Sequence, residues 1–203
     1  NRPRLHALYV RVRPLARVPL DLQAGRVPPV FGAFARRDYV TGNPLIGYPL
    51  AYQYLTSIRA DAVPAGPGEL LAMKGRGWLS GFSVGTQTLA RGTPLVSAFA
   101  WDTGVQMHAE TDRTEVAFAI TTGTLGSPRL RDDNAGKQVT GRIVLKPIFG
   151  LAIGTSASRG AFVSDAARTA AGWTDGTFAQ SALGLDAEYS RGDRKSTRLN
   201  SSH

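Results

Sequence analysis

Apolar residues alternate with polar or small residues, at a period of two, along five segments between Pro94 and Ser190. A period of two places successive side chains on opposite faces of a β-strand. The connections between the segments are alternately short and long, which predicts hairpin turns at one end of an antiparallel sheet and long loops at the other. The five predicted strands are Pro94–Glu110, Thr114–Thr124, Gln138–Lys146, Leu151–Gly160 and Phe178–Ser190.

The same alternation begins near the start of the chain. Leu5–Arg13 and Val18–Val27 predict a first pair of strands, joined by a short connection at the same end as the later hairpin turns. Pro28 and Pro29 end the second strand because proline has no amide hydrogen to donate to the sheet. About seven strands in up-and-down order are therefore expected in an all-β fold.

Residues Pro28–Thr93 form the longest connection, and it is rich in bulky apolar residues. Loops of this length are uncommon in compact domains and are often functional. One interpretation places the loop inside a barrel, where it would narrow a pore; another makes it a cap on the rim, or adds a hairpin around Trp78–Val84. Tyr48–Ile58 could form a short helix. The constriction candidates in this loop are Arg36, Arg37, Tyr48, Tyr52 and Tyr54.

Strands of about ten alternating residues have the length that crosses a bilayer, whereas strands in soluble sheets are usually shorter. No apolar run is long enough for a membrane-spanning helix. We therefore expect an antiparallel transmembrane β-barrel. Seven strands are fewer than the smallest bacterial barrels use, so residues 1–192 are expected to form a partial barrel.

A soluble or periplasmic β-sandwich that binds a ligand or partner is the alternative from a different class. In a sandwich, one apolar face of the sheet would form a dry core and the charged face would meet solvent. The core residues expected in that case are Val105, Val116, Phe118, Ile143 and Leu183.

The final segment, Asp193–His203, resembles the translation of a common sequencing adapter. We expect it to be a non-native tail that carries no function, and we leave it out of the predicted fold. The chain also lacks an initiator methionine and a signal peptide and begins inside a strand-like segment, so its N-terminus is expected to be truncated.

The chain carries a formal net charge of +9 and no cysteine. Its basic residues are scattered rather than gathered on one face with aromatic residues between them, so no nucleic-acid partner is expected. Basic loops suit the anionic head groups of an outer-membrane leaflet. The absence of cysteine excludes disulfides and thiolate metal sites.

The second face of each predicted strand is polar or charged, as expected of the wall of a water-filled lumen. Charges on opposing walls of such a lumen would orient polar solutes. The candidate pore-lining residues are Arg11, Arg13, Asp21, Gln23, Asp102, Gln106, His108, Glu110, Glu115, Arg142, Lys146, Asp186 and Glu188.

Catalytic chemistry has little support in the sequence. His108 could act as a general base beside a carboxylate, with Ser156 or Ser158 as the nucleophile. However, the segment Gly154–Ser158 lacks the last glycine of a nucleophile elbow and has no strand–turn–helix context. We expect no enzyme activity, no catalytic residue, no cofactor and no bound metal.

Residues Leu22–Gly32, with the sequence LQAGRVPPVFG, resemble the strand-end signature of phosphate-selective-porin-like outer-membrane proteins, in which a strand leads into Gly-Arg, a proline and a Phe-Gly step. The chain departs from that signature by inserting Pro29 and Val30, and it has no arginine ladder or lysine cluster. The resemblance implies a bacterial outer-membrane channel for passive diffusion of small polar solutes or ions. It also implies contact with membrane lipid and allows a homo-oligomer. Selectivity for anions or phosphate is not carried over from the family, because the arginine ladder and lysine cluster are missing.

Overall fold

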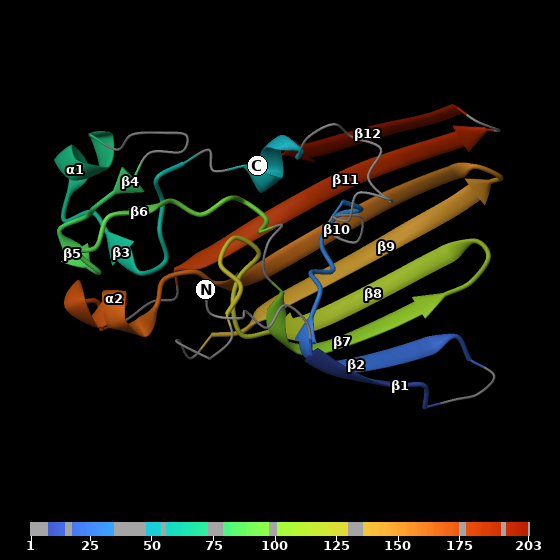
Figure 1. The fold of residues 1–203 in the computed structure, drawn as a ribbon, viewed down its shortest axis with the longest axis horizontal. Helices are drawn as coiled ribbons and strands as arrows, with labels where there is room; N and C mark the ends of the chain where they lie inside the picture. The colour runs from blue at the N-terminus through green and yellow to red at the C-terminus, as the bar shows by residue number, and fades with distance from the viewer. Residues whose placement is uncertain are drawn as a thin grey trace, which may run out of the picture.

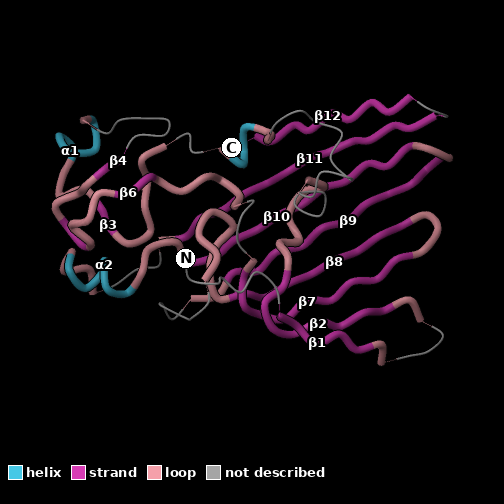
Figure 2. Tube along the Cα trace, viewed as in Figure 1, coloured by secondary structure: helices cyan, strands magenta, loops and turns pink. Residues whose placement is uncertain are grey.

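The computed structural model describes residues 8–14, 18–34, 48–53, 56–72, 79–97, 101–129, 136–174, 178–191 and 194–202. For residues 191 and 194–202 it describes the backbone alone. The chain is all-β: an eight-stranded antiparallel sheet dominates the molecule, and short strands and helices gather beyond one end of it (Figures 1 and 2).

The large sheet runs in the order β1-β2-β7-β8-β9-β10-β11-β12, so every neighbour in the sheet is also the next long strand along the chain. The first and last strands do not pair with each other, and the sheet is open. Its strands are β1 (Leu8–Val12), β2 (Leu20–Val27), β7 (Asp102–Glu110), β8 (Thr114–Thr121), β9 (Gln138–Ile148), β10 (Leu151–Ala161), β11 (Ala179–Arg191) and β12 (Arg194–Ser202).

The predicted all-β fold is confirmed, as is the alternation of short and long connections. The hairpin turns lie at the right of Figure 1 and the long connections at the left. Gly150, in the turn between β9 and β10, has a φ of 82°, a conformation that glycine adopts at no steric cost. The predicted strand Pro94–Glu110 is too long at its start, since β7 begins at Asp102.

The long connection 28–93 is not a structureless loop. It holds a 3-10 turn, η2 (Leu50–Tyr52), and a helix, α1 (Pro67–Leu71). It also holds four two-residue strands, which pair as β3 with β5 and β4 with β6. Their bounds are Ala62–Val63 for β3, Leu79–Ser80 for β4, Val84–Gly85 for β5 and Ala90–Arg91 for β6.

Helix α1 and the strands β3 to β6 form a cap at the long-loop end of the sheet, together with α2 (Asp165–Ala170) from the β10–β11 connection (Figure 1). The Ser164 side chain caps α2 by accepting a hydrogen bond from the Ala167 amide. Arg59 is buried in the cap, where it pairs with Asp61 and donates 2.8 Å hydrogen bonds to the carbonyls of Ser80 and Thr88. Arg59 thereby fixes three segments of the cap to one another.

One face of the large sheet, the outer face, is apolar and exposed. Residues paired across the strands share a face, and the outer-face pairs include Val105 with Ile120 and Val116 with Ile143. Val105 is 54% exposed and Leu185 is 55% exposed, so no described part of the chain covers them. Further exposed members of this face are Val10, Val12, Leu22, Met107, Phe118, Ile120, Val139, Ile143, Leu145, Ile153, Leu183 and Tyr189.

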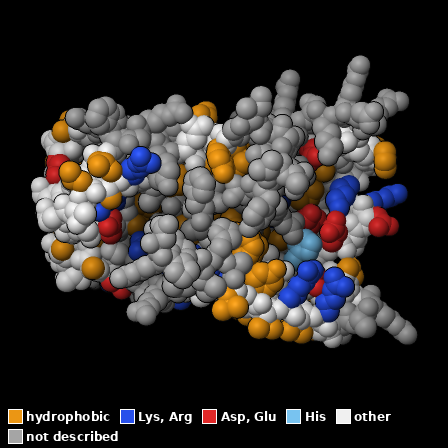
Figure 3. Space-filling model, viewed as in Figure 1, with side chains coloured by type: hydrophobic (Ala, Val, Ile, Leu, Met, Phe, Trp, Pro, Cys, Tyr) orange, Lys and Arg blue, Asp and Glu red, His pale blue; other side chains and the backbone are white. Residues whose placement is uncertain are grey.

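The opposite face, the inner face, is polar and covered. Its buried residues include Asp21, Gln106, Thr121, Gln138, Thr140, Arg142, Ser156 and Ser158. Charged side chains gather at the right of the view that looks onto this side of the molecule, near the hairpin turns (Figure 3). The molecule therefore buries the polar face of its sheet and exposes the apolar one.

A segment of the long connection, residues 28–34, runs over the inner face (Figure 1). Val30 forms a buried cluster with Ala117 and Ala119 of β8. Phe31 and Phe34 form a second cluster with Tyr52, Val96 and Leu125. We call residues 28–34 the crossing segment.

Strand β12 lies in the segment that the sequence predicts to be a non-native tail. Its backbone pairs antiparallel with β11, from Arg191 opposite Arg194 to Leu183 opposite Ser202. The origin of the tail stays a prediction.

Candidate functional site: the inner face of the sheet

The predicted pore-lining residues share the inner face. Strand register links them in rows: Asp21 lies opposite His108, Gln23 opposite Gln106, and Glu110 opposite Glu115. Arg142 continues the row of His108 and lies opposite Ser156 of β10, and Asp186 continues the row of Glu110 and Glu115 opposite Gly154. Glu188 lies opposite Ala152. Alternation within each strand is enough to put these side chains on one face, because the period of a strand is two.

A buried ion pair spans three strands of the inner face. Arg142 of β9 donates to both carboxylate oxygens of Asp186 of β11, at 2.5 and 2.7 Å, and to the Ser156 hydroxyl at 3.0 Å. The Arg142 side chain is only 5% exposed. The intervening strand β10 places Gly154 beneath this pair, where an added Cβ would lie 2.6 Å from the Arg142 guanidinium. A glycine at this position lets the arginine reach across β10.

Two more sets of paired charges lie near the hairpin turns. Asp21 accepts hydrogen bonds from Arg11 and, at 2.7 Å, from Arg13. Lys146 donates to Glu110 at 2.6 Å. Acidic and basic residues therefore neutralise each other as neighbours on one wall. The sequence analysis considered charges on opposing walls of a lumen instead. The described strands form one wall, so they do not place opposite charges across a lumen.

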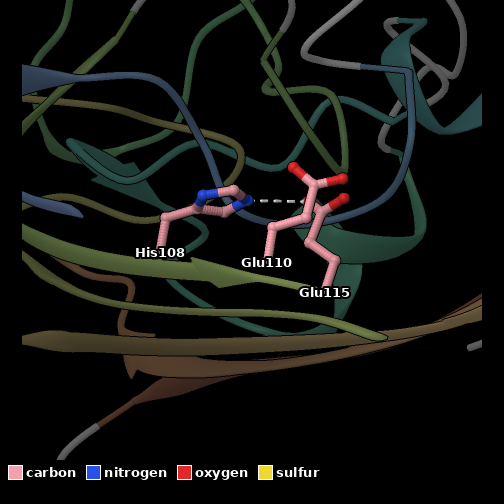
Figure 4. Close-up of side chains that lie close together, drawn as sticks. All are labelled: His108, Glu110 and Glu115. Carbon is pink, nitrogen blue, oxygen red and sulfur yellow. Dashed lines mark ion pairs between the residues drawn. The ribbon is translucent and has the colours of Figure 1, made fainter. Parts of the chain in front are cut away.

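His108, Glu110 and Glu115 form a cluster at the same end (Figure 4). Their ligand atoms all lie within 4.8 Å of one another, and His108 Nε2 is 3.2 Å from Glu115 Oε1. Among the described residues this is the group that could hold a metal ion. The sequence analysis placed all three on one face but expected no metal.

Apart from Asp102, the half of the inner face nearer the long loops is polar without being charged. Thr140 and Ser158 share a 2.8 Å hydrogen bond, and Gln138 donates to Thr121 at 3.4 Å. The nucleophiles considered for a hydrolase have other partners: Ser158 bonds Thr140, and Ser156 bonds Arg142 and the Gly32 amide. Neither hydroxyl is hydrogen-bonded to His108 in the described part of the chain.

Asp102 lies on the inner face but is occupied by the backbone. Its carboxylate accepts hydrogen bonds from the amides of Thr103, Gly123 and Arg129, between 2.8 and 3.1 Å. Asp102 therefore anchors the β8–β9 connection against the start of β7 instead of presenting a carboxylate to a lumen.

The crossing segment contacts the inner face closely. The Gly32 amide donates to Ser156 at 3.0 Å, and a Cβ added to Gly184 would lie 2.9 Å from the Phe31 ring. Phe34 in turn packs on Tyr48 and Tyr52, with ring centroids 5.5 and 4.8 Å apart.

Of the predicted constriction residues, Tyr48 and Tyr52 support the crossing segment from behind, whereas Arg36, Arg37 and Tyr54 lie outside the described residues. The residues that contact the wall are Val30 and Phe31, which the sequence analysis did not select. Small residues on the inner face could have indicated these contacts, because small side chains leave room for a second layer. Val30 packs on Ala117 and Ala119 of β8, and Phe31 lies over Gly184 of β11.

Among the described residues, no helix is both long and apolar enough to span a membrane. Comparison of the chain with protein-family models, with curated proteins and with solved structures finds no match. The resemblance to phosphate-selective-porin-like proteins therefore stays a prediction.

Proposed function

We propose that this chain is part of the wall of a bacterial outer-membrane β-barrel that lets small polar solutes or ions diffuse passively. The observation that carries the proposal is the inverted sheet, with its apolar face exposed and its polar face covered. A soluble sheet with one covered face has the opposite arrangement, with apolar residues inside and polar residues outside.

Lipid is the partner that best explains the outer face. Each of the strands β1, β2, β7, β8, β9, β10 and β11 exposes apolar side chains on this face. The exposed polar side chains on this face of β10 and β11 are Thr155, Arg159 and Ser181, and Arg159 and Ser181 lie toward the long-loop end. Soluble monomers rarely expose continuous apolar patches of more than a few hundred Å². The strands β7 to β11 contain 8 to 13 residues, close to the length of about 9–11 that a tilted strand needs to cross the hydrocarbon layer.

The inner face supports a water-filled passage that is partly filled by protein. Paired charges near the hairpin turns and hydroxyl and amide groups farther along would line the solute path. The crossing segment would narrow that path, as the first interpretation of the long loop expects. The described strands carry no ladder of arginines, so phosphate selectivity is not part of the proposal.

The open sheet has two edges, and in a bilayer both must be paired because lipid satisfies no backbone hydrogen bonds. The proposal therefore requires further strands, either from a longer chain, as the sequence analysis expects, or from other copies. The sandwich alternative requires another polypeptide to cover the outer face, and no described element does so.

The decisive experiment is reconstitution of the full-length protein in a planar lipid bilayer with single-channel recording. We expect discrete conductance steps and a reversal potential that reports the charges of the lumen. The variant Phe31→Ala should raise the conductance because it shortens a side chain of the crossing segment. The matched control is Phe118→Ala, the same substitution on the outer face, which should leave the conductance unchanged.

Two results would overturn the proposal. One is a protein that stays monodisperse in water without detergent, which would favour the binding sandwich. The other is a protein that inserts into the bilayer and does not conduct, which would indicate a closed or plugged barrel.

A further inference from the structure

His108, Glu110 and Glu115 form a compact cluster near the hairpin turns of the inner face (Figure 4). His108 and Glu110 are two positions apart on β7, so both face inward. Glu115 of β8 lies directly opposite Glu110 in the strand register. Carboxylates directly opposite each other repel, and in this structure Glu110 is compensated by Lys146 and Glu115 lies beside His108. A metal ion shared by both carboxylates would compensate them together.

The His108 nitrogen that faces Glu115, Nε2, lacks a hydrogen bond of normal geometry. Nε2 is buried and makes no hydrogen bond among the described residues, although it lies 3.2 Å from Glu115 Oε1. The side chains of His108 and Glu115 are 12% and 13% exposed, so little water reaches the two side chains. When Nε2 carries no proton, its lone pair and the Glu115 carboxylate oxygen are close enough to bind one cation.

The surroundings favour positive charge and provide access. A hollow of about 480 Å³ on one side of the cluster is lined by four carboxylates, those of Glu110, Glu115, Asp186 and Glu188, against two cations, Arg142 and Lys146. A second hollow, of about 470 Å³, reaches His108 and Glu110 from the side of β1 and β2. The second hollow is also lined by Arg11 and Arg13 against Asp21, so we expect a metal ion to enter the cluster from the more acidic first hollow.

We propose that His108, Glu110 and Glu115 bind a divalent transition-metal ion, with Zn²⁺ as the best match. Imidazole suits zinc, copper and nickel, whereas magnesium and calcium prefer sites made of oxygen alone. Three protein ligands leave a fourth position of a tetrahedral zinc ion for water or a passing solute. The site is independent of whether the barrel conducts.

Lys146 competes with the metal for Glu110. Its ammonium lies 2.6 Å from Glu110 Oε1, and its side chain is partly exposed. Zinc binding requires Lys146 to withdraw or Glu110 to offer its other oxygen. Removing the ammonium with Lys146→Met should therefore tighten zinc binding.

The test is a ZnCl₂ titration of the purified full chain in detergent micelles, followed by calorimetry, with Co²⁺ absorption as a spectroscopic measurement of coordination. His108→Asn and Glu115→Gln should each weaken zinc binding by at least the factor of about 10–100 that loss of an outer-shell partner costs. The matched control is Glu188→Gln, which removes a carboxylate of the same hollow outside the cluster and should change the affinity little. The other two histidines of the chain, His6 and His203, are kept in every variant, so that the variants differ from the parent only at the named residue.

Three results would overturn the site: no saturable zinc binding, equal weakening by Glu188→Gln and His108→Asn, or equal affinity for Mg²⁺ and Zn²⁺. The last two would indicate a diffuse negative surface. Circular dichroism of each variant checks that the sheet is intact. If His108→Asn does not fold, Lys146→Met still decides, since unchanged or weaker zinc binding in that variant contradicts the site.

Discussion

The outer and inner faces of the large sheet are built from the same strands but differ in side chains and in burial. The outer face carries exposed apolar side chains, and the inner face carries buried polar ones. On the outer face, Ile143 and Leu185 are exposed; on the inner face, Arg142 and Ser156 are buried. Burial of polar groups costs free energy unless they are hydrogen-bonded. The inner face meets this condition largely through pairs, such as Arg142 with Asp186 and Thr140 with Ser158.

This difference shows that the sheet is not stabilised by a dry core between its own layers. The apolar clusters that do exist are small and lie where the crossing segment meets the inner face. The fold therefore depends on two separate conditions: the pairing of polar groups on one face and an apolar environment for the other.

The largest effect is expected from breaking the buried ion pair. Asp186→Ala leaves the Arg142 guanidinium buried without its carboxylate, and removal of one partner of a buried pair costs about 3–5 kcal/mol. The measurement is urea unfolding of the micelle-bound protein. Replacing both partners, as Arg142→Met with Asp186→Leu, should cost less than the single change. A single variant as stable as the parent would show that the pair contributes nothing to the inner face.

A charge on the outer face should have the next largest effect. Ile143 lies in the middle of β9 and is 47% exposed. Ile143→Arg should cost about 2–4 kcal/mol if that position meets the centre of a bilayer. The control is Ile143→Leu, which keeps the site apolar and should change the stability by less than about 1.5 kcal/mol. Equal stability and normal insertion of both variants would contradict a lipid-facing outer face.

The sequence predicts the two faces well because alternation is local information. The strand predicted at Gln138–Lys146 is β9, Gln138–Ile148, and the one predicted at Leu151–Gly160 is β10, which ends at Ala161. Alternation also places Arg142 and Asp186 on one face. Their bond depends on Gly154 of the strand between them, and the pattern of apolar residues does not encode that contact.

The crossing segment and the cap could not be predicted in the same way. Phe31 meets Gly184 although the two are far apart in the sequence, and two-residue strands such as β3 and β5 are too short to show any alternation. Their positions depend on long-range packing. The Arg59 network illustrates this, because its acceptors come from three separate positions in the chain.

A smaller effect is expected where the inner face is polar and uncharged. Ser158→Ala leaves the Thr140 hydroxyl buried without its 2.8 Å partner, which costs about 1–3 kcal/mol. Adding Thr140→Val replaces both hydroxyls by apolar groups of similar shape, so the double variant should be close to the parent in stability. Urea unfolding of the three proteins measures this. Additive losses in the double variant would mean that the two hydroxyls do not act as a pair.

The smallest effect is expected in the cap, which belongs to neither face. Hydrogen bonds from Arg59 lower the pKa of the Asp61 carboxyl below its ordinary value. Because the folded-state pKa lies below that of an unfolded chain, about 3.9, the pair stabilises the cap above about pH 4, and this stability is lost as the pH falls through the folded-state pKa. Asp61 is 43% exposed, so solvent screening keeps the effect small.

Hydrogen exchange of residues 56–72 between about pH 5 and pH 2 measures this loss. We expect protection in the cap to decrease over that range while protection in β9 and β10 changes less. Asp61→Asn removes the titrating group and should make cap protection nearly independent of pH. If the variant keeps the parent's pH dependence, another group controls the cap. If β9 and β10 lose protection together with the cap, the cap and the sheet unfold as one unit, and the contrast between them is not one of stability.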